Sequence, residues 1–435
     1  MQPTSDAWIS PSSAEHLRKL IRLMMGLAVV TWAWAGGGCS RSGGGDGPGM
    51  DGGADAAITD ARVDATTDPV DGGDGQVDGS PDRSQQTILG GRFNAEVYRD
   101  GLSVAAWINF YEEPPVRTTV LYQLGEVAAQ TALSYLQIGI TAHRHIEWAD
   151  PQSDPHLSNL IQFLNDARSH GFGVVINLAN PCVVPNDVIP ESLELKYQSY
   201  CGRRKEEAPW PIPYEPLQSN WKQEAIRWYG EIITQIESQV PDAATSVVVV
   251  ANGNVRNPYG AEFRLDTENP HLAWVQEYLE ALIPALADLT QLRIGIQTRP
   301  YLEKYDADWP RKYEFLDNIP AIVKAQTDFL AITSYTTGEP SHIADRLGGL
   351  LHKAMLTDFG LHDPDGLPES EILQWHFAQM QQLQLYPGGW FWALRDEHNA
   401  VGDLIKRGIW RSAVHADGGF KQAAVQAIND YSTGL

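Results

Sequence analysis

The chain has 435 residues and a formal net charge of −23. Such an acidic balance argues against binding to nucleic acids and to anionic membrane surfaces.

The N-terminal segment has the pattern of a targeting signal. Basic residues at positions 18, 19 and 22 precede an apolar run over residues 23–35, which leads through three glycines to Cys39. The run is too short for a comfortable membrane span of about 20 residues. We predict a bacterial lipoprotein signal peptide over residues 1–38, with Cys39 lipidated and the mature protein anchored to the outer membrane or cell surface. Secretion without a lipid is the alternative, because Gly36 stands where such signals usually carry Leu.

The next segment has little to bury. Residues 40–86 contain ten Asp, three Arg and no Glu or Lys, among many Gly, Ala and Ser. Such a composition cannot offset the entropy lost on ordering, so we predict a disordered tether over residues 39–86. Its Asp-Gly-Gly groups could bind calcium in a repeat protein, but their spacing is irregular. The globular domain then covers residues 87–435.

Strand and helix patterns alternate from Leu102 onward. We expect strands over residues 102–110, 138–146, 173–179, 247–252, 292–298, 328–335, 354–358 and 388–394. Helices are expected over residues 120–136, 156–170, 220–239, 271–289, 313–325, 341–350, 369–385 and 420–431. Eight apolar strands alternating with eight helices predict an α/β fold, a (β/α)8 TIM barrel. A doubly wound open sheet is less favoured, because no Gly-rich phosphate loop follows a strand.

Two further cysteines lie in one proline-rich loop. Cys182 and Cys201 follow the third predicted strand, and an oxidising compartment permits them to pair. We therefore predict a disulfide, with two free buried thiols as the alternative.

Polar and aromatic side chains gather at the ends of the predicted strands, where a (β/α)8 barrel carries its active site. Aromatic faces stack on sugar rings and planar polar groups bind hydroxyls, so these residues predict a carbohydrate ligand. They include Trp107, Asn109, His143, Arg144, His145, Glu147, Asn177, Asn252, Asn254, Gln297, Tyr335, Asp358, Trp390, Trp392 and Asp396.

The seventh strand brings a carboxylate to this end of the barrel. Strand alternation places Ala354, Leu356 and Asp358 on one face, and Met355 and Thr357 on the other. Asp358 is followed at once by a glycine-containing loop, which predicts an acidic group at the barrel mouth. A carboxylate that merely caps the following turn is the alternative.

Five segments in order resemble the clan-A glycoside hydrolases, the group that contains cellulases and β-mannanases. The resemblance covers nearly all of residues 100–410. It rests on ITAHRHIEW with Arg144, VVVVANGN, Tyr335 after the sixth strand, LTDFG, and GGWFWALRD. It implies a sugar-binding mouth that includes Trp107, Asn109, Arg144, His145, Asn252, Asn254, Tyr335, Trp390 and Trp392.

The sequence departs from that family at both catalytic positions. The family has Glu as general acid/base after the fourth strand, where this chain has Gly253. Its nucleophile is a seventh-strand Glu, where this chain has the shorter Asp358. Retaining enzymes hold the two carboxyl groups about 5–5.5 Å apart, so another carboxylate would have to serve as acid. Glu262 is the first candidate, ahead of Glu147 and Asp396.

Three hypotheses follow. The first is a surface-tethered glycoside hydrolase with atypical carboxylates, Asp358 and Glu262. The second is a sugar-binding barrel without catalysis, and the third a different, metal-assisted barrel hydrolase. His143 and His145 could form half of a metal site, but no convincing further ligands accompany them, so we expect no metal and no cofactor. We expect a monomer that contacts the membrane only through its lipid anchor.

Overall fold

The computed structural model describes residues 87–99, 102–104, 106–140, 145–146, 150–178, 221–252, 270–298, 314–334, 339–360, 367–386, 388–398, 404–411 and 419–434. The predicted signal peptide, Cys39 and the tether lie outside the described residues, as do Cys182 and Cys201.

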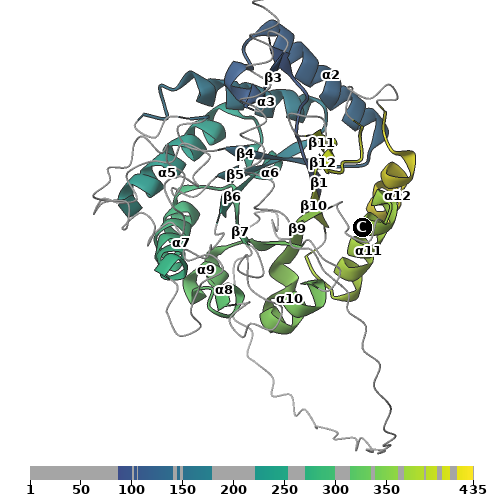
Figure 1. Cartoon of the computed structure of the whole chain (residues 1–435). Helices are drawn as coiled ribbons and strands as arrows, with labels where there is room; N and C mark the ends of the chain where they lie inside the picture. The colour runs from purple at the N-terminus through teal and green to yellow at the C-terminus, as the bar shows by residue number, and fades with distance from the viewer. Residues whose placement is uncertain are drawn as a thin grey trace, which may run out of the picture. The chain divides into compact units, whose positions relative to one another are not determined.

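Eight parallel strands close into a barrel (Figure 1). Around the barrel they follow the order β1-β10-β9-β8-β7-β6-β5-β4, and β4 pairs with β1 to complete the ring. Their bounds are β1 (Ile88–Arg92), β4 (Tyr135–Ile140), β5 (Gly173–Leu178), β6 (Val247–Asn252), β7 (Arg293–Thr298), β8 (Phe329–Thr333), β9 (Ala354–Gly360) and β10 (Gly388–Trp392). The predicted TIM barrel is confirmed.

Helices surround the strands (Figure 1). Their bounds are α2 (Pro114–Gln130), α3 (Pro155–Ser169), α5 (Trp221–Gln239), α6 (Ala243–Ser246), α7 (Pro270–Leu289), α8 (Glu314–Asp317), α9 (Ala321–Gln326), α10 (Glu339–Leu347), α11 (Glu369–Gln382) and α12 (Gln422–Thr433). One predicted helix, over residues 313–325, is divided into α8 and α9, because Pro320 supplies no N–H and stands just before α9. Among the described residues, no helix combines the length and apolarity that a membrane crossing needs.

The first barrel strand differs from the prediction. Residues 102–110 do not enter the barrel: Leu102–Ser103 is strand β3, paired antiparallel with β2 (Tyr98–Arg99), and Trp107–Phe110 is the 3-10 helix η2. The barrel strand is β1, whose sequence is ILGGR. A Cβ at Gly90 would lie 2.8 Å from the Tyr135 carbonyl oxygen, so close packing demands the glycine that makes this strand look like a turn.

Small two-stranded and 3-10 elements complete the described chain. β11 (Glu397–His398) pairs antiparallel with β12 (Leu404–Lys406), and the 3-10 helix η7 (Gly348–Lys353) leads into β9.

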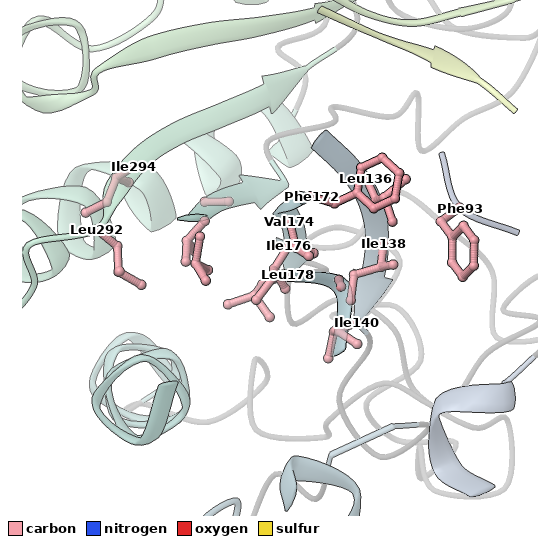
Figure 2. Close-up of a cluster of buried hydrophobic side chains, with 14 of the residues drawn as sticks. Phe93, Leu136, Ile138, Ile140, Phe172, Val174, Ile176, Leu178, Leu292 and Ile294 are labelled. Atoms are coloured by element: carbon pink, nitrogen blue, oxygen red, sulfur yellow. The ribbon is translucent and has the colours of Figure 1, made fainter. Parts of the chain in front are cut away.

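The outward faces of the strands form a core with the helices. On β4, Leu136, Ile138 and Ile140 share this face, and Val174, Ile176 and Leu178 continue it on β5 (Figure 2). All six side chains are buried, and the strand period of two sends the intervening residues into the barrel. Burial contributes roughly 1.5–3 kcal/mol for each such side chain.

A second core fills the barrel interior, and glycines make space for its rings. A Cβ at Gly173 would lie 2.3 Å from the Tyr135 ring, and one at Gly295 would lie 2.3 Å from the Phe329 ring. The interior core comprises Ile88, Tyr135, Val175, Val248, Val250, Phe329, Ala331, Met355, Tyr386 and Trp390. The barrel is therefore packed below its mouth, as a TIM barrel normally is.

Candidate active site at the carboxyl ends of the strands

A bulge in β9 turns Asp358 into the barrel. Trp390 of β10 pairs with Thr357, but Phe391 pairs with Phe359, so Asp358 is an extra residue between two registers. Its φ of 46° lies in the left-handed region, which Asp tolerates better than most residues. The backbone therefore reverses the direction of the Asp358 side chain relative to a regular strand.

Because of this bulge, the expectation that Asp358 shares one face with Ala354 and Leu356 is wrong. Ala354 and Leu356 face outward to the helices, whereas Met355 belongs to the interior core. Regular alternation would have sent Asp358 outward with Ala354 and Leu356. Asp358 instead contacts Gln297 and Trp390, by a different backbone path from the one that alternation indicated.

Two N–H donors hold the Asp358 carboxylate. Gln297 Nε2 donates to Oδ2 at 2.5 Å, and Trp390 Nε1 donates to Oδ1 at 2.9 Å. All three side chains are buried, Asp358 being 7% exposed. A carboxylate that accepts N–H hydrogen bonds is stabilised in its ionised form, and bonds of this kind are about twice as strong as neutral ones. Asp358 is therefore an acceptor whose two oxygens are held in place at the end of β9.

A second amide extends this network across the barrel. Asn177 Nδ2, on β5, donates to Gln297 Oε1, on β7. The carboxylate can only accept, so the Gln297 amide must turn its nitrogen toward Asp358 and its oxygen toward Asn177. The path Asn177–Gln297–Asp358–Trp390 thus joins β5, β7, β9 and β10 through side chains.

Within the described ranges, other polar atoms in or just after the strands are buried and have no hydrogen-bond partner there. They include Gln137 Oε1, Asn177 Oδ1, Ser334 Oγ and Thr357 Oγ1. Buried polar groups usually have partners in protein or ordered water.

The two tryptophans of β10 have different environments. Trp390 is completely buried and bonds to Asp358, so it positions the carboxylate and offers no face for a sugar. Trp392 is half-buried at the end of the strand, and the guanidinium of Arg92 lies 3.5 Å from its ring centroid. The expectation that both rings bind substrate is therefore wrong for Trp390, and Trp392 remains the candidate.

Trp107 does not lie at a strand end. It is buried in an aromatic cluster with Phe93, Tyr111 and Phe163, at centroid distances of 5.7, 5.9 and 5.0 Å. Its assignment to the sugar-binding mouth is therefore wrong, because residues 107–110 form a 3-10 helix that packs on the outer core.

The remaining predicted site residues are only partly described. Asn109 lies on η2 and is half-buried, and His145 is buried just beyond β4. Asn252 ends β6 and is paired in register with Gln297. Outside the described residues lie Arg144, Asn254, Tyr335, Gly253, Glu147 and the proposed acid, Glu262.

Asp396, one of the candidate acids, is engaged elsewhere. Its Oδ1 accepts hydrogen bonds from Lys421 Nζ at 2.9 Å and from Gly408 N at 2.7 Å. Lys421 also binds Glu369 at 2.7 Å. This partly buried ion-pair group ties α11 and α12 to the segment after β10, which is a structural role. In the described part of the chain, no group of three or more His, Cys, Asp or Glu side chains could hold a metal ion.

Comparison with known proteins rests on the fold alone. No family model and no curated protein matches the sequence. A solved GH5_18 structure from Bifidobacterium longum subsp. longum superposes with a TM-score of 0.52 at 10% identity, covering 80% of each chain. One from Bifidobacterium longum subsp. infantis gives 0.51 at 11% identity, covering 81% of this chain and 79% of that one.

The barrel has the fold of a GH5 glycoside hydrolase. The expected resemblance to the clan-A glycoside hydrolases is thereby confirmed at the level of fold. A further match is a Glu-to-Ala variant of the subsp. longum GH5_18 protein in complex with Manβ1-4GlcNAc, with a TM-score of 0.51 at 10% identity over 80% of this chain and 78% of that one.

The sequence pattern indicated Asp358 as a site residue, but it did not indicate which side chains hold Asp358 in place. Gln297 and Asn177 were recognised only as polar residues at strand ends. Their alternation with apolar neighbours in LRIGIQT and GVVINLA could have placed both side chains inside the barrel. Their contact with each other depends on the strand order and register of the closed barrel, which the sequence pattern does not specify.

Proposed function

We propose that the barrel domain acts on a poly- or oligosaccharide as a glycoside hydrolase-like protein, with Asp358 as its nucleophile. The observation that carries this proposal is the fixed Asp358 carboxylate. It stands at the carboxyl end of a barrel strand, turned inward by the bulge and held by Gln297 and Trp390. A nucleophilic carboxylate must be ionised and restrained in position, and both donors serve that purpose.

The carboxylate is also shorter than the family's Glu. One methylene fewer withdraws the reactive oxygens by about one C–C bond, roughly 1.5 Å. A displacement of that size from the best attacking geometry can cost on the order of a hundredfold in rate. We therefore infer slow turnover even when the leaving group departs easily.

Proton donation to the leaving group is the second requirement. Gly253 has no side chain at the position of the family's acid/base, and Asp396 is bound by Lys421. Glu262, in the loop after β6, is the remaining first candidate for the acid. A glycoside with an activated aryl leaving group needs no protonation, so it should react faster than a natural oligosaccharide.

A sugar-binding barrel without catalysis is the second candidate. It is favoured by the glycine at position 253 and by the Asp358 contacts, since hydrogen bonds to Gln297 and Trp390 also suit a carboxylate with a structural role. On this alternative, Trp392 and the mouth residues would bind a glycan that is never cleaved.

The two candidates are separated by one experiment on the purified protein. Wild type and Asp358→Asn are assayed against a panel of aryl glycosides and natural oligosaccharides, and glycan binding is measured in parallel. The proposal predicts slow hydrolysis of an aryl glycoside by wild type, none by the variant, and binding by both. Binding by wild type without any hydrolysis would support the sugar-binding alternative.

We also propose that the domain works at the bacterial surface, tethered through lipidated Cys39 and the acidic linker. A linker of about 47 residues in a Gly-rich random coil would have an end-to-end distance of roughly 35–40 Å. This reach would let an anchored barrel contact polysaccharide outside the membrane.

A further inference from the structure

We propose that Gln297 is a positioning residue for Asp358, and that Asn177 fixes the orientation of the Gln297 amide. This inference rests on the proposed function for its catalytic meaning. Its structural content stands on the contacts among three side chains from β5, β7 and β9.

Only one orientation of the Gln297 amide satisfies both of its hydrogen bonds, to Asp358 and to Asn177. Gln297 Nε2 donates to Asp358 Oδ2 at 2.5 Å, and Gln297 Oε1 accepts from Asn177 Nδ2. If the Gln297 amide were rotated by half a turn, an oxygen would face the carboxylate and a nitrogen would face the Asn177 nitrogen. Both contacts would then be repulsive, so each hydrogen bond holds the Gln297 amide in the orientation that the other hydrogen bond requires.

Burial makes this arrangement important. Gln297 is 1% exposed and Asp358 is 7% exposed, so water cannot readily replace a lost bond. A short Asp side chain has only two rotatable bonds, and Gln297 and Trp390 hold its two oxygens from different strands. The carboxylate is thereby fixed in the plane that these two donors define.

Complementary substitutions test the polarity of the path. Asp358→Asn replaces one of two acceptor oxygens by an amide nitrogen, which must then face either Gln297 Nε2 or Trp390 Nε1. Gln297→Glu places two carboxylates in contact. The double variant, Gln297→Glu with Asp358→Asn, restores one donor and one acceptor at each link. We expect each single change to lower the midpoint of urea unfolding and the double variant to recover most of that loss. Additive losses would overturn the proposal.

Kinetics test the positioning role. Gln297→Leu should lower kcat on the best aryl glycoside by on the order of tenfold to a hundredfold, with little change in KM. The matched control is Gln123→Leu on α2, because Gln123 is also buried and makes two hydrogen bonds, to the backbone of Glu96. The control should lose stability and keep its kcat. Equal kcat values for Gln297→Leu and Gln123→Leu would overturn the positioning role.

The two measurements also separate this inference from the proposed function. If the double variant recovers stability but wild type cleaves no glycoside, the proposed function is wrong, and the path still explains how Asp358 is held. If wild type is active and the double variant shows no recovery, Asp358 reacts without this support and the present inference is wrong.

Discussion

His376 provides a quantitative test of the packing behind the site. It lies on α11, is 1% exposed, and stacks on Phe359, the neighbour of Asp358, at a centroid distance of 4.8 Å. Its Nδ1 lies 2.8 Å from the carbonyl oxygen of Ile372, and its buried Nε2 has no hydrogen-bond partner among the described residues. Burial lowers the pKa of His376 from 6.5 to about 4, and only the bond to Ile372 opposes this shift. The folded protein therefore holds the ring neutral.

The sign of the pH dependence follows from this shift. The unfolded chain binds a proton at His376 near pH 6.5, whereas the folded chain binds it only near pH 4. The contribution of the neutral His376 ring to the free energy of unfolding is therefore complete above pH 6.5, and it is lost progressively as pH falls toward 4. By linkage, this one group lowers the free energy of unfolding by about 2 kcal/mol between pH 7 and pH 5.

His376→Phe should remove this pH-dependent contribution to the free energy of unfolding, while an aromatic ring still stacks on Phe359. Urea unfolding of wild type and variant at pH 7 and pH 5 measures the difference, and the many carboxylates cancel because both proteins share them. The free energy of unfolding should fall by about 2 kcal/mol more in wild type than in the variant. Substitution of the exposed His352 by Phe is the control. Parallel pH curves for wild type and His376→Phe would refute the reasoning.

Three further predictions concern the mouth, the loop cysteines and the anchor. Trp392→Ala should weaken glycan binding by about 1 kcal/mol, which is roughly fivefold in Kd. The control variant Trp375→Ala, on α11, should bind as wild type does. Equal titration curves for wild type and Trp392→Ala would show that this ring is not part of the site. If Cys182 and Cys201 are bridged, a reducing agent should lower Tm, since such a bridge contributes about 3 kcal/mol; two alkylatable thiols in the native, unreduced protein would exclude it. Cys39→Ser should release the protein from membranes, and a mature protein that retains residues 1–38 would disprove lipidation.

Most strands and helices were predictable because their side chains follow a clear period. β5, β6 and β7 are rich in Val and Ile, and α3, α5 and α7 begin and end within about a residue of the expected positions. β1 escaped prediction because two of its five residues are glycines, which the Tyr135 backbone and the Phe391 ring require. The pattern at residues 102–110 has strand-like alternation, yet part of it folds into a 3-10 helix.

The site was less predictable than the fold. One extra residue in β9 reverses the facing of Asp358, and nothing in LTDFG distinguishes a bulge from a regular strand. The roles of Trp390 and Trp392 also differ although they stand two residues apart in one strand. Trp390 donates a hydrogen bond to Asp358 inside the barrel, whereas the ring of Trp392, at the end of the strand, contacts the Arg92 guanidinium. This difference depends on the depth of each ring in the barrel, which the sequence does not indicate.

Covalent trapping tests the reactive role of Asp358 most directly. The aryl glycoside that wild type hydrolyses best would be prepared as its 2-deoxy-2-fluoro analogue, which slows breakdown of a glycosyl-enzyme intermediate. Peptide mapping by mass spectrometry after incubation should then find the sugar esterified to Asp358, with no label in Asp358→Asn. A label on another carboxylate, or hydrolysis of the parent glycoside with no label on Asp358, would contradict the assignment of Asp358 as nucleophile.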